Sequence, residues 1–109
     1  MELSKDLVAA SATPLVLSIL KEGDSYGYAI IKRVKELSGE EMEWTDGMLY
    51  PVLHRLEKQG SISAYWQKSQ TGRRRKYYSL THEGGENLET LKTQWLLVNE
   101  TLNRTWKQG

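Results

Sequence analysis

The hydrophobic period of this chain changes at Gly60. Before Gly60, apolar residues recur every three or four positions, as they do on one face of a helix. After it, the stretch SISAYW alternates polar and apolar side chains, which is typical of a strand with one buried face. The loop SQTG and a second run, RRRKYYSL, complete a hairpin. The chain therefore has to fold as a set of helices followed by a β-hairpin.

Two helices are predicted in the first 40 residues. The first spans about residues 7–20, and because Pro14 lacks the N–H of a regular helical residue, we expect a break near Thr13. The second begins with Ser25 as its N-cap and ends at Gly39. Apolar residues recur at helical spacing in both segments.

A third helix is predicted from Thr45 to Gln59. Its apolar stripe consists of Leu49, Val52, Leu53 and Leu56. Because Pro51 cannot lie deep inside a regular helix, we expect the regular turns to start only near Met48. The preceding segment, EEMEW, is either a brief strand or a turn.

The hairpin has an inward and an outward face. Ile62, Ala64 and Trp66 fall on the same side of the first strand, so we expect all three to pack on the helices. Tyr77 and Tyr78 alternate across the return strand, so one of them faces the core and the other faces out.

A long final helix is predicted after Thr81, which is a favourable N-cap. Its apolar residues are spaced by three and four positions, at Leu88, Leu91, Trp95, Val98 and Leu102. This is the seam of a coiled coil and predicts a dimer interface. Because only about two heptads are present, the stripe also fits a helix that packs on its own domain.

Positive charge is concentrated in one part of the sequence. Residues 54–76 hold seven Lys and Arg side chains and one acid, a net charge of +6, whereas the whole chain carries only +1. The remaining residues therefore sum to −5. A basic patch on an otherwise acidic protein indicates a polyanionic partner that binds one face.

Three helices followed by a hairpin describe a winged helix-turn-helix, a mainly α fold with a small β-hairpin. The third helix of such a domain enters the major groove of DNA, and the hairpin, or wing, lies beside it. The cations of TGRRRK would then contact phosphates, for which arginine offers a planar fork of donors. Taken alone, this basic loop also fits a solvated tip.

The composition disfavours several classes of protein. The chain has no cysteine, which excludes disulfides and thiolate metal sites, and its two histidines, His54 and His82, are widely separated in sequence. No apolar run approaches the roughly 20 residues of a membrane span, so we expect a soluble cytoplasmic protein. No arrangement of nucleophile and base and no phosphate loop appears, so we do not expect an enzyme.

Three blocks of the sequence carry a resemblance to a known family: GDSYGYAIIKRVKELS, DGMLYPVLHRLEKQGSISAYW and GRRRKYYSLTHEG. In order and spacing they resemble the PadR family of bacterial transcriptional regulators over nearly the whole chain. The resemblance implies a winged-helix DNA-binding domain at residues 1–80, whose N-terminal helix contributes to the dimer, and a dimerisation helix at residues 81–109. It also implies repression of a nearby operon that a small molecule relieves.

The resemblance assigns DNA-binding roles to the start of the second helix, the outward face of the third helix and the wing. The implied DNA-binding residues are Ser25, Tyr26, Lys32, Gly47, Met48, Tyr50, Pro51, His54, Arg55, Lys58, Gly72, Arg73, Arg74, Arg75 and Lys76. The family commonly has a small hydroxyl residue where this chain has Met48. We therefore expect base contacts there to differ from those of the family.

Trp95 marks a second candidate site. In the shorter, multidrug-sensing branch of the family, a tryptophan at this place lines a pore at the dimer centre and stacks on flat aromatic ligands. The expected companions in this chain are Leu7, Ala10, Pro14, Val98 and Asn99. Because Asn99 stands where that branch has an acid, a preference for cationic drugs is not implied. The alternative is that Trp95 only fills the dimer seam.

The leading hypothesis is therefore a dimeric repressor that binds a pseudo-palindromic operator and is released by a flat aromatic molecule. The alternative is a winged helix that contacts other proteins without reading DNA sequence, which the dense charge of the wing disfavours. RNA binding is disfavoured because a two-stranded hairpin is a small platform for stacking bases.

Overall fold

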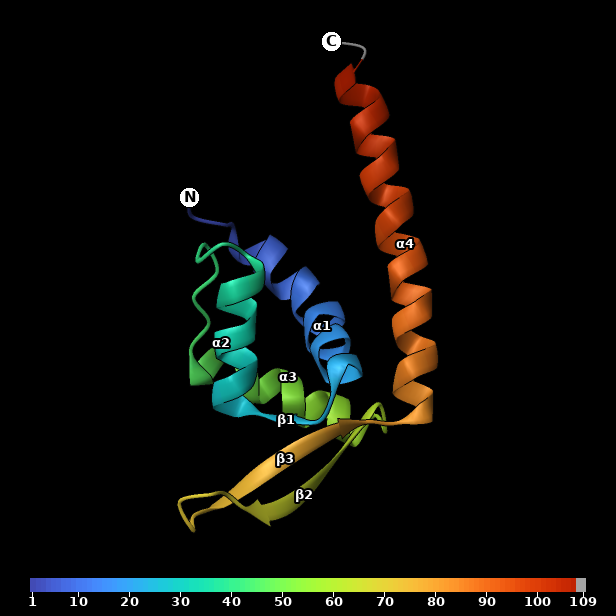
Figure 1. Cartoon of the computed structure of the whole chain (residues 1–109). Coiled ribbons are helices and arrows are strands. Elements are labelled where there is room, and N and C mark those ends of the chain that lie inside the picture. Colours follow the sequence, from blue (N-terminus) through green and yellow to red (C-terminus); the bar gives the residue numbers. More distant parts are fainter. Residues whose placement is uncertain (108–109) are drawn as a thin grey trace.

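Figure 1 shows the computed structural model, which describes residues 1–107. The elements are α1 (Lys5–Glu22), β1 (Ser25–Tyr26), α2 (Gly27–Leu37), α3 (Asp46–Lys58), β2 (Ile62–Lys68), β3 (Arg74–Leu80) and α4 (His82–Lys107). The predicted mainly α fold with a hairpin is confirmed, and β1 adds a short third strand. The last two residues of the predicted segment 81–109 lie outside the described residues.

Helix α1 is continuous, so the predicted break near Thr13 is wrong. The helix starts after Ser4, whose hydroxyl accepts a hydrogen bond from the backbone N–H of Leu7 at 3.2 Å. Pro14 removes one backbone hydrogen bond, but the buried face of α1 holds the helix on the core on both sides of it. The Thr13 hydroxyl caps nothing and instead accepts a hydrogen bond from Arg55 at 2.6 Å.

The start of α2 also differs from the prediction. Ser25 is not the N-cap, because Ser25 and Tyr26 are extended and pair with Tyr78 and Tyr77 of β3. Tyr26 is the N-cap residue and makes no side-chain capping hydrogen bond. The sequence predicted either a brief strand or a turn for the stretch EEMEW, and the structure has no strand there.

Helix α3 begins at Asp46, close to the predicted start at Thr45, so the delay of the regular turns to Met48 was predicted wrongly. The Thr45 hydroxyl accepts a hydrogen bond from the N–H of Met48 at 3.3 Å and caps the first turn. Pro51 lies inside this helix, and the carbonyl of Gly47, four residues earlier, loses its usual partner. Gly47 is exposed, so water can satisfy that carbonyl.

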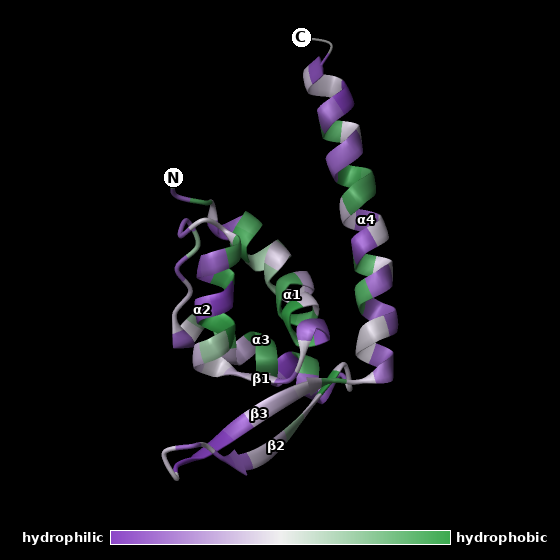
Figure 2. Cartoon of the chain, in the orientation of Figure 1, coloured by the Kyte–Doolittle hydropathy of each residue, from purple (hydrophilic) through white to green (hydrophobic). Residues whose placement is uncertain are grey.

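One hydrophobic core joins all four helices to the base of the hairpin. Its fully buried members are Val16, Leu17, Ile30, Val34, Leu49, Leu53, Leu56, Ile62 and Leu88. Figure 2 shows the apolar faces of α1, α2 and α3 gathered between these helices, whereas the far end of the hairpin is hydrophilic. As predicted, one tyrosine of the pair on β3 faces the core, and it is Tyr78.

The sheet has the strand order β1-β3-β2 and is antiparallel throughout. The β2–β3 hairpin extends away from the helices (Figure 1). At its other end Thr81 caps α4 as predicted, accepting a hydrogen bond from the N–H of Gly84 at 3.0 Å. Only glycine fits at position 84, because an added Cβ would overlap the carbonyl of Ser61.

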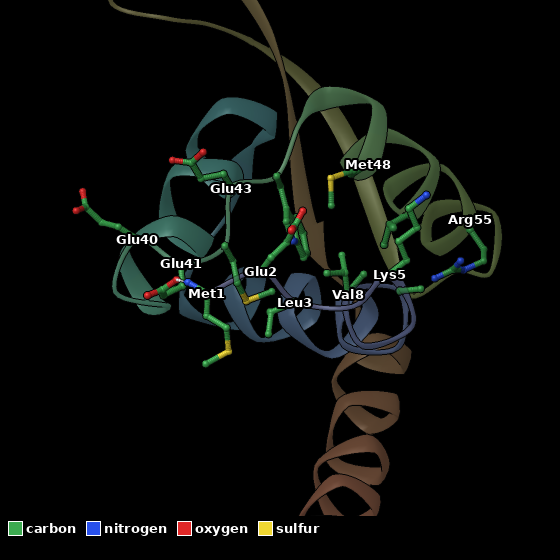
Figure 3. Close-up of a pocket in the computed structure, with 15 residues that line it drawn as sticks. Met1, Glu2, Leu3, Lys5, Val8, Glu40, Glu41, Glu43, Met48 and Arg55 are labelled. Atoms are coloured by element: carbon green, nitrogen blue, oxygen red, sulfur yellow. Dashed lines mark hydrogen bonds and ion pairs between the residues drawn. The ribbon is translucent and has the colours of Figure 1, made fainter.

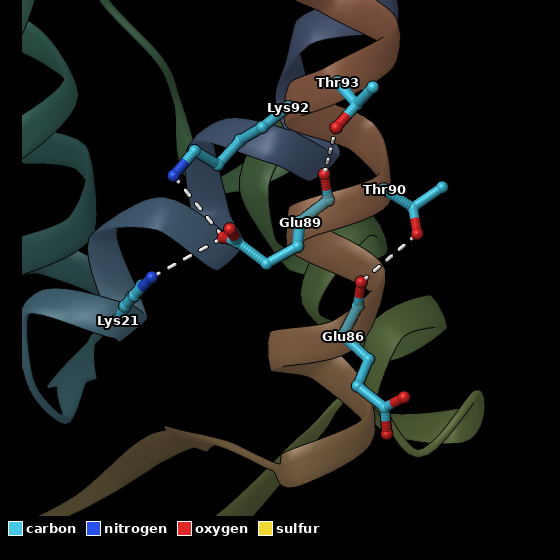
Figure 4. A network of polar contacts seen from close by, with 6 residues as sticks. All are labelled: Lys21, Glu86, Glu89, Thr90, Lys92 and Thr93. Atoms are coloured by element: carbon cyan, nitrogen blue, oxygen red, sulfur yellow. Dashed lines mark hydrogen bonds and ion pairs between the residues drawn. The ribbon is translucent and has the colours of Figure 1, made fainter.

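Helix α4 packs on α1 over its first turns and then leaves the domain (Figure 1). Glu89 lies 3.5 Å from Lys21 of α1 and 3.4 Å from Lys92, as Figure 4 shows. The hydrogen bond from Lys92, together with the charge of Lys21, lowers the pKa of Glu89. Among residues 1–107, no helix combines the length and apolar character of a membrane span.

Candidate nucleic-acid interface

Helix α3 presents one exposed face and one buried face. Leu49, Val52, Leu53 and Leu56 are buried, as predicted from their spacing. The remaining positions assigned to DNA binding on α3 are all exposed, and they are Gly47, Met48, Tyr50, Pro51, His54, Arg55 and Lys58. The structure therefore brings the predicted groove-reading side chains together on one side of a single helix.

Two side chains of this face also make contacts inside the domain. The hydroxyl of Tyr50 lies so close to Gly27 that a Cβ there would overlap it, and Gly27 is the first residue of α2. Arg55 donates a hydrogen bond to Thr13 of α1. These contacts fix how α3 sits against α1 and α2, so Tyr50 and Arg55 also position the helix.

The tip of the hairpin is a tight turn that carries Arg73. The N–H of Ser69 donates to the carbonyl of Arg73 at 2.7 Å, and the N–H of Gly72 donates to the carbonyl of Ser69 at 3.0 Å. Gly72 has φ +87°, a left-handed conformation that favours glycine. The turn leaves Arg73 exposed at the end of the wing.

The other three cations of the wing lie on aromatic rings. The guanidinium carbon of Arg75 is 4.3 Å from the ring centroid of Tyr26, and that of Arg74 is 5.4 Å from the ring of Trp66. Lys76 Nζ lies 5.6 Å from the ring of Tyr78. Such contacts hold a cation in place without neutralising it. The wing therefore presents ordered positive charge at Arg74 and Arg75, which the sequence pattern alone did not predict.

Tyrosines brace the face of the wing that carries Arg75. Tyr77 lies between Tyr26, in an edge-to-face contact at 5.3 Å, and Tyr65, in a stacked contact at 5.7 Å. The hydroxyl of Tyr65 donates to the carboxylate of Asp24 at 2.6 Å, and this hydrogen bond raises the pKa of Tyr65. Tyr26 therefore links the start of α2 to the wing.

Trp66 is not a core residue, contrary to the prediction. Ile62 is buried and Ala64 is half-buried, but Trp66, next on the same face, is 58% exposed. The hairpin has by then passed beyond the helices that cover its base (Figure 1). The sequence held a signal for this, because Lys68 and Arg74 follow on the same face and do not suit a core.

Two further positions predicted to bind DNA lie outside α3 and the wing. Ser25 is half-buried in β1, and Lys32 is exposed on α2. Lys76 on β3 lies 3.6 Å from Glu57 on α3 and ties the wing to that helix. We name the exposed face of α3 together with the wing residues 72–76 the basic surface.

The predicted dimer and ligand residues fall into two groups. Leu88 is buried in the core of its own domain and is not available to a partner, and Leu91 packs against that core. Trp95, Val98 and Leu102 are exposed, with 37%, 53% and 43% of their surfaces open. The predicted seam therefore divides into a part that packs within the chain and a part that stands free.

The residues predicted to line a ligand pore lie on two helices, α1 and α4, and most of them are exposed. Leu7 and Ala10 are exposed on α1, Pro14 is half-buried, and Trp95 and Asn99 are exposed on α4. In Figure 1 the N-terminal end of α1 and the free end of α4 diverge. A pore at Trp95 would therefore need a second subunit to close it.

A groove of about 840 Å³ lies elsewhere, between the N-terminal end of α1, the segment 40–44 and α3 (Figure 3). Trp44 is buried in its wall, and its Nε1 has no hydrogen-bond partner within residues 1–107. Met48 and Arg55 of α3 also line the groove. Over those same residues, no three His, Asp or Glu side chains gather as a metal site would require.

Comparison with known proteins gives concordant matches. The model of the transcriptional regulator PadR-like family matches residues 16–90. A transcriptional regulator from Clostridium thermocellum is similar in structure, with a TM-score of 0.84 and 34% identity over 94% of this chain and 96% of that one. A PadR-like transcriptional regulator from Bacillus cereus has a TM-score of 0.83 and 28% identity, covering 96% of this chain and 99% of that one.

A curated relative is longer than this chain. The negative transcriptional regulator PadR of Bacillus subtilis is 28% identical over 92 residues, which cover 84% of this chain and 48% of that protein. This chain thus spans about half the length of that relative.

Proposed function

This chain belongs to the PadR-like family of transcriptional regulators, and we propose that it is a dimeric repressor that binds a pseudo-palindromic operator in duplex DNA. The observation that carries the proposal is the basic surface, in which the exposed face of α3 and a braced cationic wing are joined by Lys76 and Glu57. The name of the Bacillus subtilis relative, a negative regulator, supports repression. Such a role belongs in the bacterial cytoplasm, where the chromosome is.

Helix α3 would enter the major groove and the wing would follow the adjacent backbone. His54 and Met48 are exposed on α3 and would face base edges, whereas Lys58 and the wing arginines would contact phosphates. Arg73 is the wing cation best placed for this, because it lies exposed at the tip.

Two such domains would be held together by the free end of α4. Residues 1–80, together with the first turns of α4, would form the DNA-binding unit, and the free end of α4 would form the dimerisation helix. Two-fold symmetry then places the recognition helices on half-sites about one helical turn, roughly 34 Å, apart.

Release by a flat aromatic molecule is the second part of the proposal. Trp95 is partly exposed on α4, and in a symmetric dimer two indoles could face one guest. A ligand there would lower DNA affinity only if it binds best to a dimer in which the spacing of the two recognition helices does not match that of the half-sites.

The test is a fluorescence polarisation titration with labelled duplex from immediately upstream of the protein's own gene, against a scrambled duplex of equal composition. We expect much tighter binding to the upstream duplex. If each subunit neutralises about four phosphates, log affinity falls against log salt with a slope of about −7. Equal binding to both duplexes, on this and other candidate promoters, would contradict sequence-specific regulation.

Two variants separate the roles within the basic surface. Arg73→Ala removes one phosphate contact from each of the two subunits, so it should weaken both duplexes to a similar degree and reduce the steepness of the salt dependence by about two. His54→Ala removes a groove-facing side chain and should change the preference between operator variants. If neither variant alters DNA binding, the winged-helix module for protein contacts becomes the better explanation.

A further inference from the structure

Trp66 exposes a large apolar surface on a face of the wing that ends in cations. The β2–β3 register places Trp66 opposite Lys76 and Ala64 opposite Tyr78. Side chains two residues apart on a strand share a face, so Trp66 continues the face that begins at the core. Tyr78 is only 3% exposed, whereas Trp66 is 58% exposed. The indole therefore does not contribute to the core.

Arg74 lies over this indole. Its guanidinium carbon is 5.4 Å from the ring centroid, and the register puts Arg74 opposite Lys68 at the far end of the same face. An exposed aromatic ring is thus surrounded by positive charge. A partner that covers the indole therefore needs an apolar surface against the ring and negative charge beside it.

The face that carries Trp66 is also the face joined to α3. Lys76, directly opposite Trp66, lies 3.6 Å from Glu57 of α3. Trp66 therefore lies between the wing tip and the C-terminal half of the recognition helix. A duplex that contacts both α3 and the wing cations has to pass close to the indole.

From this geometry we infer that Trp66 packs on the sugar–phosphate backbone of duplex DNA and holds Arg74 against a phosphate; the inference rests on the proposed DNA-binding function. Deoxyribose offers an apolar surface to the ring, and the guanidinium fork of Arg74 matches phosphate oxygens. Because the indole already holds Arg74 in place, less side-chain freedom is lost when DNA binds. Trp66 is thus a DNA contact that also positions an arginine.

A double-mutant cycle on the full chain tests this with the upstream duplex as probe. We expect Trp66→Ala to weaken binding about tenfold, an effect the size of a single base-stacking contact. Arg74→Ala should also cost about tenfold in the wild-type background, but less than threefold when Trp66 is already absent, because Arg74 has then lost its position. Gln67→Ala is the matched control, since Gln67 is exposed on the opposite face of the same strand.

A direct readout covers the case in which Trp66→Ala fails to fold. Tryptophan emission of the wild type and of Trp66→Phe is quenched with acrylamide, with and without the duplex. The emission that is present in the wild type and missing in Trp66→Phe comes from Trp66. We expect the duplex to reduce acrylamide quenching of that emission. Three results would overturn the inference. The first is that the duplex gives Trp66 no protection from quenching, and the second is that Trp66→Ala binds the duplex as tightly as the wild type. The third is an Arg74→Ala substitution that weakens DNA binding equally with and without Trp66.

The same titrations separate this inference from the proposed function. A wild type that prefers the upstream duplex while Trp66→Ala binds equally well overturns only the role of Trp66. A wild type that binds no duplex overturns both.

Discussion

The two halves of α4 have the same amphipathic spacing but different surroundings. In the first half, Leu88 is 1% exposed and belongs to the core of its own domain. In the second half, large apolar side chains remain uncovered in the single chain, and they are Trp95, Leu96, Leu97, Val98, Leu102 and Trp106. Figure 2 shows hydrophobic bands on the free half of α4, beside which no other described element lies.

This difference indicates what each half of α4 is for. A buried leucine stabilises the domain that contains it, whatever the oligomeric state. A long run of exposed apolar residues on one helix is unfavourable in a monomer and marks an interaction site. We therefore expect substitutions in the first half to affect folding, and substitutions in the second half to affect assembly or ligand binding.

Leu88→Ala should have the largest effect. It removes buried methyl groups and leaves a cavity between α4 and the core, so we expect the free energy of unfolding to fall by about 3 kcal/mol. Chemical denaturation at one fixed protein concentration measures this. Leu37→Ala is the control, because Leu37 is 50% exposed at the end of α2 and should cost less than about 0.5 kcal/mol. Similar losses in both variants would contradict the assignment of Leu88 to the core.

Leu102→Asp should come next and should act on the dimer. In a symmetric interface the substitution places two carboxylates at an apolar seam, so we expect the dissociation constant of the dimer to rise about 100-fold, equal to about 2.7 kcal/mol. Sedimentation velocity over a dilution series measures this. Thr101→Asp adds the same charge to the neighbouring, polar position and should leave the dimer nearly unchanged. Equal dissociation in both variants would show that added charge alone, and not the seam, is responsible.

The sequence predicted the elements of this fold well because their signals are local. The change of hydrophobic period at Gly60 and the cap at Thr81 both depend on neighbouring residues. The errors arose where tertiary contacts override local preference. Pro14 and Pro51 are tolerated inside helices that the core holds in place, and Ser25 pairs with a strand about 50 residues away instead of capping α2.

The candidate site was predictable in its position but not in its internal contacts. The exposed face of α3 could be predicted because the spacing of its buried leucines shows which side of the helix faces the core, and the other side must then be exposed. The aromatic supports of the wing cations depend on strand register, which brings Arg75 of β3 to Tyr26 of the neighbouring strand β1. The burial of Trp66 was predicted wrongly because alternation gives the face of a side chain, and not how far the helices extend over that face.

Trp95→Ala should have a smaller effect, confined to ligand binding. Trp95→Ala removes both indoles that would face one guest, at about 1 kcal/mol each, so we expect affinity for a flat aromatic probe such as acridine to fall about 30-fold. Dye polarisation in the absence of DNA measures this, and operator affinity should change less than twofold. Trp106→Ala, further along α4, is the control and should not alter dye binding. Equal losses of dye and operator affinity would mean that Trp95 holds the dimer together.

Glu89→Gln should have the smallest effect and tests how α4 is attached to α1. Lys92 and Lys21 lower the pKa of Glu89 in the folded chain, so its charge stabilises the fold above the pKa of the unfolded state, and this contribution is lost as the pH falls. We expect a slightly lower melting temperature for the variant at pH 7, and a difference that disappears as the pH falls through the lowered pKa of Glu89 in the folded chain. Glu100→Gln is the control, because the partner of Glu100, Arg104, lies within α4. A difference that persists at low pH would show that the shape of the side chain, and not its charge, fastens the two helices.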